Sequence, residues 1–276
     1  MDDLIKAYNE QGFCVAKKLL PTAVPLAVLK EVDQLTAMQL KRFGKKAMAF
    51  KNEDTLHENM KLLLSTNLDA YLGVLRHIGK LLSVQEMMCH QKIQEMVKNL
   101  GVELPSMPTN TVVHVMSDEL KIPGGYFGVG THQDWPSIQG SLDSVVIWAP
   151  LMDVAENFPL QIIPKSHLKG LWDGVNTAHA REIPKSAYKE SDFVSVEMDR
   201  GDVIFFSVFT VHRSGMQHKG KDCTGLRIGC NFRYDNCTDP TFAERNFYCA
   251  YKRTVERELV TPNFPKLEQV QKLFKR

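Results

Sequence analysis

The sequence has 276 residues, a formal net charge of +2 and 24% charged residues, a composition typical of globular proteins. Lysine and arginine are spread along the chain without a basic block, which argues against a surface for nucleic acid or another polyanion. No stretch approaches the roughly 18 consecutive apolar residues of a membrane helix, and the acidic start at Asp2 and Asp3 is unlike a signal peptide. We therefore expect a cytoplasmic protein without a nucleic-acid or membrane partner.

The cysteines favour a reduced protein. There are six of them, at positions 14, 89, 223, 230, 237 and 249, and no two form a CxxC pair. A zinc site built from Cys223, Cys230 and Cys237 is an alternative, but their seven-residue spacing is unlike that of a zinc knuckle.

The first hundred residues predict mostly helices. A short amphipathic helix is expected to end near Gly12, where glycine suits a helix stop, and residues 13–16 form a brief buried strand. From Pro21 apolar residues recur at helical spacing, and the helical pattern continues from residue 52 to residue 100. We interpret residues 1–105 as a helical buttress.

After Gly101 the pattern changes to short runs rich in β-branched residues. The candidate strands are 111–116, 143–149, 160–163, 193–198, 203–208 and 226–234. Turn residues separate them with little helix between, which favours an antiparallel barrel or sandwich. We predict one mainly β domain of the α+β class, with its barrel core over residues 108–235. A helix over roughly 240–259 and a tail are expected to complete the segment 236–276.

His132 and Asp134 are the first candidate metal ligands. On an extended segment their side chains share one face, so they can bind one ion together. The pair alone is weak evidence, because a chain of this composition contains about 0.5 such H-x-D pairs by chance. His212 follows a later apolar run and is the best third ligand. Two histidines and one carboxylate form the facial triad of non-haem Fe(II) oxygenases.

An oxygenase that uses a 2-oxo acid needs an arginine to bind the far carboxylate. Arg227 lies between leucine and isoleucine in a core strand and is the first candidate. Arg213 and Arg233 are competitors, and Arg233 can share the face of Arg227 further along the strand. Ser214 can lend a hydroxyl to the same carboxylate.

Several passages resemble one known family. They are Tyr8–Val15, Thr131–Asp134, Ile147–Leu151, Leu160–His167, Gly201–Ser214 and Arg227–Tyr234. In this order they resemble the phytanoyl-CoA dioxygenase-like family of Fe(II)- and 2-oxoglutarate-dependent oxygenases, over nearly the whole chain. In two places the chain departs from the pattern. Lys165 replaces the usual glycine, and the interval from His212 to Arg227 is lengthened around residues 218–222.

The resemblance implies a double-stranded β-helix, or jelly roll, and an oxidoreductase. Its implied site residues are His132, Asp134 and His212 for iron and catalysis, and Arg227, Ser214, Gln133 and Trp148 for 2-oxoglutarate. It implies O₂ as co-substrate, ascorbate as a candidate reductant, and hydroxylation of an unactivated C–H bond with release of succinate and CO₂. His167 matches a family position and is expected to be structural. Because Asp134 is intact, a halogenase is disfavoured.

The substrate is expected to be a small molecule, and the protein a monomer or homodimer. Trp135, Ile138 and Gln139 follow the metal motif and are candidates for the mouth of the site. Residues 168–191, with Trp172, His179 and Arg181, are a candidate lid; alternatively, Trp135 and Trp172 pack against the helical buttress. The competing function is a metal-binding, cupin-like barrel without oxygenase activity, such as a zinc hydrolase, an isomerase or a degenerate binding protein.

Overall fold

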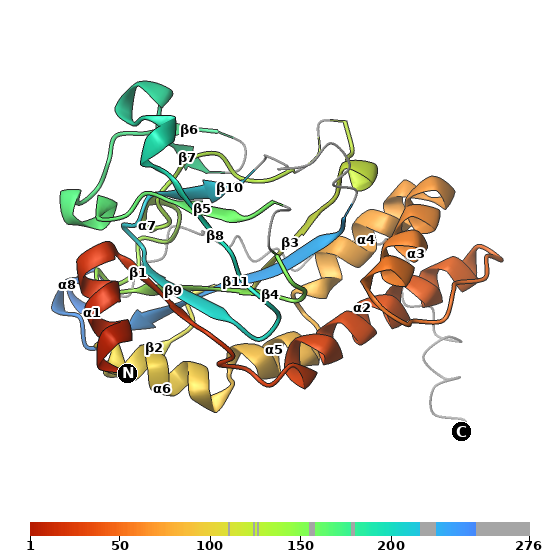
Figure 1. Cartoon of the computed structure of the whole chain (residues 1–276), viewed down its shortest axis with the longest axis horizontal. Coiled ribbons are helices and arrows are strands. Elements are labelled where there is room, and N and C mark those ends of the chain that lie inside the picture. The colour runs from red at the N-terminus through yellow and green to blue at the C-terminus, as the bar shows by residue number, and fades with distance from the viewer. Residues whose placement is uncertain are drawn as a thin grey trace.

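The computed structural model describes residues 1–109, 111–123, 125, 127–154, 158–177, 180–215 and 225–246. Two antiparallel sheets face each other, and most of the helices of the first hundred residues cover the outer face of the larger sheet (Figure 1). This arrangement confirms the predicted α+β class with a jelly-roll core and a helical buttress. Within the described ranges no helix is long and apolar enough to cross a membrane.

The helices agree with the predicted buttress and add boundaries. The α-helices are α1 (Asp2–Gln11), α2 (Ala23–Arg42), α3 (Glu53–Thr66), α4 (Leu68–Ile78), α5 (Leu82–Met88), α6 (Gln91–Asn99), α7 (Trp135–Ile138) and α8 (Pro240–Glu244). Short 3₁₀ turns are η1 (Asp118–Leu120), η2 (Ser166–Lys169), η3 (Lys185–Ala187) and η4 (Glu190–Asp192). The helical run predicted for 52–100 is thus four helices. Asn52 and Asn67 begin two of them by accepting a backbone N–H from the first turn, as N-cap residues do.

Helix α1 ends at Gly12, as predicted. Gly12 has φ 85°, and its N–H donates to Tyr8 O over 2.8 Å. A side chain at this position would also collide with His167. His167 Nε2 lies 3.0 Å from Asn9 O, so this histidine connects η2 to α1 and lies apart from the cavity described below.

The strands are β1 (Phe13–Ala16), β2 (Pro105–Ser106), β3 (Val112–Met116), β4 (Val145–Pro150), β5 (Leu160–Ile162), β6 (Val175–Asn176), β7 (Arg181–Glu182), β8 (Val194–Val196), β9 (Val203–Ser207), β10 (His212–Ser214) and β11 (Arg227–Asn236). In the large sheet the order is β1-β9-β4-β11-β2, with β3 also paired to β11. The small sheet has the order β10-β5-β8, and β6 pairs with β7. The short hairpin β6–β7 was not among the predicted strands.

The two faces of the large sheet have different neighbours. The outward face, which includes Ile147, Phe205 and Phe232, packs with the helices in the main hydrophobic core. The inward face, which includes Val146 and Phe206, packs against the small sheet. This alternation follows from the two-residue period of a strand. The cavity of the functional site lies between the two sheets and is lined by residues of both.

The C-terminal helix is described only in part. Helix α8 begins at Pro240, where Asp239 caps it by accepting the N–H of Thr241, and it ends at Glu244. The remainder of the helix predicted for 240–259, and the tail after it, lie outside the described residues.

Candidate metal centre

The three predicted ligands lie together. His132 and Asp134 come from the segment that leads into α7, and His212 begins β10. The backbones of His132 and His212 pair as an antiparallel bridge, with both N–H···O distances 3.0 Å. The Asp134 N–H donates to Val208 O over 3.1 Å, which fixes this segment on the turn before β10. Backbone pairing therefore brings together His132 and His212, which are 80 positions apart in sequence.

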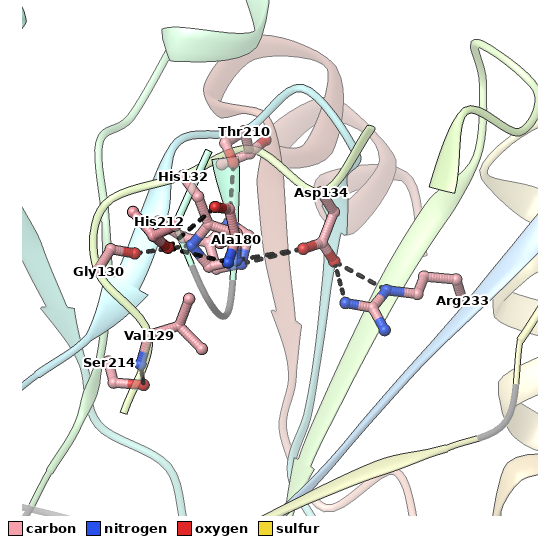
Figure 2. Close-up of polar contacts among 10 residues, drawn as sticks. Val129, Gly130, His132, Asp134, Ala180, Thr210, His212, Ser214 and Arg233 are labelled. Carbon is pink, nitrogen blue, oxygen red and sulfur yellow. Dashed lines mark hydrogen bonds and ion pairs between the residues drawn. The ribbon is translucent and has the colours of Figure 1, made fainter. Parts of the chain in front are cut away.

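The ligand atoms of these side chains point toward one another (Figure 2). His132 Nδ1 lies 2.8 Å from Gly130 O, and His212 Nδ1 lies 3.0 Å from Thr210 O. Each imidazole therefore carries its proton on Nδ1 and turns Nε2 inward. Asp134 Oδ1 lies 3.3 Å from Nε2 of His132 and 3.8 Å from Nε2 of His212. In the part of the chain that the structure describes, this is the one group of such residues whose ligand atoms converge.

The charges at the site fit a cation. Burial, together with the smaller effect of His132, lowers the pKa of His212 to about 3, so the His212 Nε2 lone pair faces the Asp134 carboxylate at neutral pH. Burial by itself would raise the pKa of Asp134, but Arg233 and the two histidines hold it well below its usual range. A neutral imidazole acceptor and a carboxylate repel each other at this distance unless a cation lies between them. Two imidazoles and one carboxylate suit iron or zinc.

Arg233 makes a contact that the sequence did not reveal. Its Nε and Nη2 lie 2.8 Å and 2.6 Å from the same oxygen of Asp134, Oδ2. Both side chains are buried. The other competitor, Arg213, is engaged elsewhere: its Nη2 lies 2.6 Å from Glu190 Oε2, and its guanidinium covers the ring of Phe193.

A cavity of about 280 Å³ opens at the ligand atoms. Its lining residues are Val112, His114, Val129, His132, Asp134, Ser137, Trp148, Leu160, Ala180, His212, Arg213, Ser214, Arg227, Asn231 and Arg233. Arg227 is buried, with its guanidinium 4.8 Å from the Trp148 ring and Nη1 2.7 Å from Met116 Sδ. Ser214 Oγ accepts the N–H of Val129 over 3.1 Å. Arg227, Ser214 and Trp148 thus line the same cavity as the three predicted ligands.

This cavity has the character of an anion site. Burial, together with the smaller effects of Arg227 and Arg233, lowers the pKa of His114 to about 3, so this imidazole stays neutral beside the two arginines. Trp148 Nε1 and Arg233 Nη1 are buried donors without a partner among the described residues. Buried donors need an acceptor, and a dicarboxylate supplies several.

Three predicted site residues lie elsewhere. Gln133 does not line the cavity: its Nε2 donates to Gly170 O and Phe209 O, and its Oε1 accepts the Trp172 N–H. It lies between His132 and Asp134, so an extended backbone turns it to the opposite side. Trp135 stacks on Phe209, and Gln139 donates to Pro136 O. Neither lines the cavity, because α7 begins directly after Asp134 and carries them away from it.

The predicted lid segment borders a second cavity of about 720 Å³. Its walls come from Gly128–Thr131 and from residues 182–190, and it shares Val129, Arg213 and Ser214 with the first cavity. Trp172 packs with a small cluster around Ile163 and not against the buttress, and Trp135 packs inside the two sheets. The expectation that these tryptophans contact the helical buttress is therefore wrong. His179 lies outside the described residues.

The chain matches the model of a known protein family. The family model described as phytanoyl-CoA dioxygenase (PhyH) matches residues 8–221. The chain belongs to this family. Enzymes of the PhyH family are non-haem, 2-oxoglutarate-dependent oxygenases, so the predicted enzyme class is confirmed at the level of the family. No curated protein gives a significant sequence match to this PhyH chain.

Solved structures with the same fold include three enzymes. The epimerase SnoN, in complex with Fe³⁺, α-ketoglutarate and nogalamycin RO, is 18% identical, with 86% of this chain and 84% of SnoN covered and a TM-score of 0.56. The carbocyclase SnoK from nogalamycin biosynthesis is 14% identical, with 93% and 94% covered and a TM-score of 0.54. EctD from S. alaskensis with 2-oxoglutarate and 5-hydroxyectoine is 14% identical, with 87% and 77% covered and a TM-score of 0.54. At these identities the likeness establishes the fold.

Proposed function

We propose that this PhyH protein is an Fe(II)- and 2-oxoglutarate-dependent dioxygenase that hydroxylates a small molecule. One observation carries the proposal: the inward-facing atoms of His132, Asp134 and His212 converge at the wall of a cavity that also contains Arg227. A zinc hydrolase has no need of a buried arginine beside its metal, whereas a 2-oxo acid does.

The metal would be held by Nε2 of His132, Oδ1 of Asp134 and Nε2 of His212. Carbonyl groups of Gly130 and Thr210 orient the two imidazoles by accepting their Nδ1 protons. When bound, Fe(II) with 2-oxoglutarate supplies O₂ activation coupled to conversion of the oxo acid to succinate and CO₂. The three side chains would occupy one side of the metal and leave the side that faces the cavity open. Co-substrate and substrate would bind there.

Arg227 would bind the far carboxylate of 2-oxoglutarate. The Trp148 ring and the Met116 sulfur shield its guanidinium from water, which strengthens an ionic hydrogen bond in the cavity. The Trp148 Nε1 donor and the Ser214 hydroxyl lie in the same wall and would support the anion. The competitors Arg213 and Arg233 each contact a carboxylate, whereas the Arg227 guanidinium lies beside the Trp148 ring in the cavity wall, which favours Arg227 as the anchor.

The size of the space supports a small-molecule substrate. The cavity at the ligands, about 280 Å³, adjoins one of about 720 Å³, and ligand pockets of roughly 300–1,000 Å³ are usual for small molecules. The segment 182–190 would cover the substrate and exclude water from the site. SnoN is an epimerase and SnoK a carbocyclase, so hydroxylation is our choice among outcomes that this fold accommodates.

Succinate formation tests the proposal. Purified protein with Fe(II), 2-oxoglutarate and O₂ is expected to release succinate, and a metabolite screen should find a compound that stimulates this release and gains 16 mass units. The His132→Ala variant should lose the activity, because one of three ligands is gone. His77→Ala is the matched control, since His77 is exposed on α4. Equal turnover in His132→Ala and in the wild type would contradict the ligand assignment.

A spectroscopic test separates the rival barrel without oxygenase activity. Under anaerobic conditions, Fe(II) with 2-oxoglutarate should give a weak visible charge-transfer band in the wild type but not in His132→Ala. A protein that gives no band and retains zinc tightly through purification would support the rival instead.

A further inference from the structure

Arg233 and Asp134 form a buried ion pair with an asymmetric geometry. Both donor nitrogens of Arg233 contact Oδ2, at 2.8 Å and 2.6 Å, while Oδ1 faces the two histidines (Figure 2). The two oxygens of one carboxylate therefore have separate neighbours. Oδ2 of Asp134 contacts Arg233, and Oδ1 is directed toward the ligand atoms of the two histidines.

The pair connects two distant parts of the fold. Arg233 lies on β11, where its backbone is paired with Val146 of β4, so the arginine starts from the middle of the large sheet. Asp134 lies on the segment before α7, which has backbone hydrogen bonds to Val208 but no strand of its own. The rigid sheet thus holds a carboxylate that comes from a less regular segment.

Stability alone is a poor explanation for this contact. Removing two charges from water costs free energy, and replacing a buried ion pair with apolar side chains is often neutral or stabilising. Val146 and Phe206 show that apolar side chains pack well on the same inward face of this sheet. An arginine here therefore suggests a role that an apolar side chain cannot fill.

We propose that Arg233 is a positioning residue that holds Asp134 as a one-oxygen ligand of the metal. The inference rests on the proposed function, because it assumes the metal site of His132, Asp134 and His212. By occupying Oδ2, Arg233 prevents Asp134 from binding the metal through both oxygens and fixes the direction of Oδ1. This leaves more of the metal's coordination positions for co-substrate and substrate.

The proposal predicts different effects for two arginines of one strand. Contacts behind a metal ligand typically contribute about 10–100-fold to metal affinity. In Arg233→Met we expect a loss of this size for Mn(II), measured by electron paramagnetic resonance in the absence of 2-oxoglutarate. Arg227→Met is the matched control, since it removes the same charge from the same strand, and the Arg227 guanidinium lies beside Trp148 and Met116. It should bind Mn(II) like the wild type.

A second readout distinguishes positioning from a structural role. Co(II) absorbance reports coordination number, and a two-oxygen Asp134 ligand in Arg233→Met should alter the visible spectrum at saturating Co(II). A variant that folds, as judged by circular dichroism and thermal melting, and that matches the wild type in Mn(II) affinity and Co(II) spectrum would overturn the proposal.

Arg233→Lys decides the question if Arg233→Met does not fold. Lysine retains the buried charge but offers one nitrogen, so it cannot reproduce the two-donor contact. We expect a smaller loss of Mn(II) affinity with an altered Co(II) spectrum, and wild-type values for both would overturn the proposal. Failure of the proposed function would look different, because the wild type itself would then release no succinate.

Discussion

The two faces of strand β11 carry different kinds of side chain. The outward set is Ile228, Cys230, Phe232 and Tyr234, and the inward set is Arg227, Asn231, Arg233 and Asp235, of which the first three line the cavity. Every residue of the strand is buried, yet the first set is largely apolar and the second is polar or charged. Because side chains alternate along a strand, one ten-residue segment contributes to both the core and the site.

The difference shows where stability and function can be separated. Each large apolar side chain on the outward face contributes about 1.5–3 kcal/mol through burial against the helices. Polar groups on the cavity face gain nothing from burial and require partners or a ligand. A substitution on the outward face should therefore change the free energy of unfolding, and one on the cavity face should change metal or ligand binding.

Phe232→Ala should give the largest effect on stability. Phe232 is fully buried against the core, and truncation of such a side chain typically costs about 3–5 kcal/mol. Urea unfolding measures the loss. In buffer without urea, at a temperature where the variant is folded, its Mn(II) affinity should stay within about twofold of the wild-type value. A large drop in metal affinity of the folded variant would show that the two faces are coupled.

Asp235 is on the same side of β11 as the cavity residues but does not line the cavity, so a substitution there should change stability. Its carboxyl is buried and accepts a hydrogen bond from Ser144. Burial raises its pKa from 3.8 to about 6, despite the opposing hydrogen bond. Between about pH 4 and pH 6 the folded state then holds more protons than the unfolded state. The protonated Asp235 therefore stabilises the folded state at low pH, and this stabilisation is lost as the pH rises through 6. For a shift of about two pKa units the loss is about 3 kcal/mol.

The matched variant for this effect is Asp235→Asn, which keeps the shape and cannot ionise. Its stability relative to the wild type should increase by about 3 kcal/mol between pH 4 and pH 7. Denaturant unfolding at each pH measures the difference. A constant difference over this range would contradict the raised pKa.

Short-range patterns predicted much of this molecule. The β-branched run before Met116 and the apolar run after Gly201 identify β3 and β9, and the H-x-D spacing indicates two candidate ligands on one segment. His212 could be inferred because it follows a buried strand and a turn. These predictions depend on local periodicity, which survives in most folded contexts.

What the patterns missed depends on backbone direction and long-range contacts. Trp135 and Gln139 were predicted at the mouth of the site because they follow the metal motif, but α7 begins directly after Asp134. The pair of Arg233 with Asp134 joins residues 99 positions apart, so no local rule reveals it. The six-residue interval from Arg227 did indicate a shared face, and that signal was available in the sequence.

Arg227→Lys should give the smallest change in free energy of the three variants, and it tests directly whether the cavity face binds 2-oxoglutarate. Lysine retains the charge, but it cannot form two parallel hydrogen bonds with a carboxylate or stack on Trp148 in the same way. We expect the dissociation constant for 2-oxoglutarate, measured anaerobically with Mn(II) bound, to rise about tenfold, or about 1.4 kcal/mol. Mn(II) affinity without 2-oxoglutarate should not change. If the variant bound 2-oxoglutarate as tightly as the wild type, the far carboxylate would have to lie against another donor of the cavity, and Arg233 Nη1 and Trp148 Nε1 would be the next to replace.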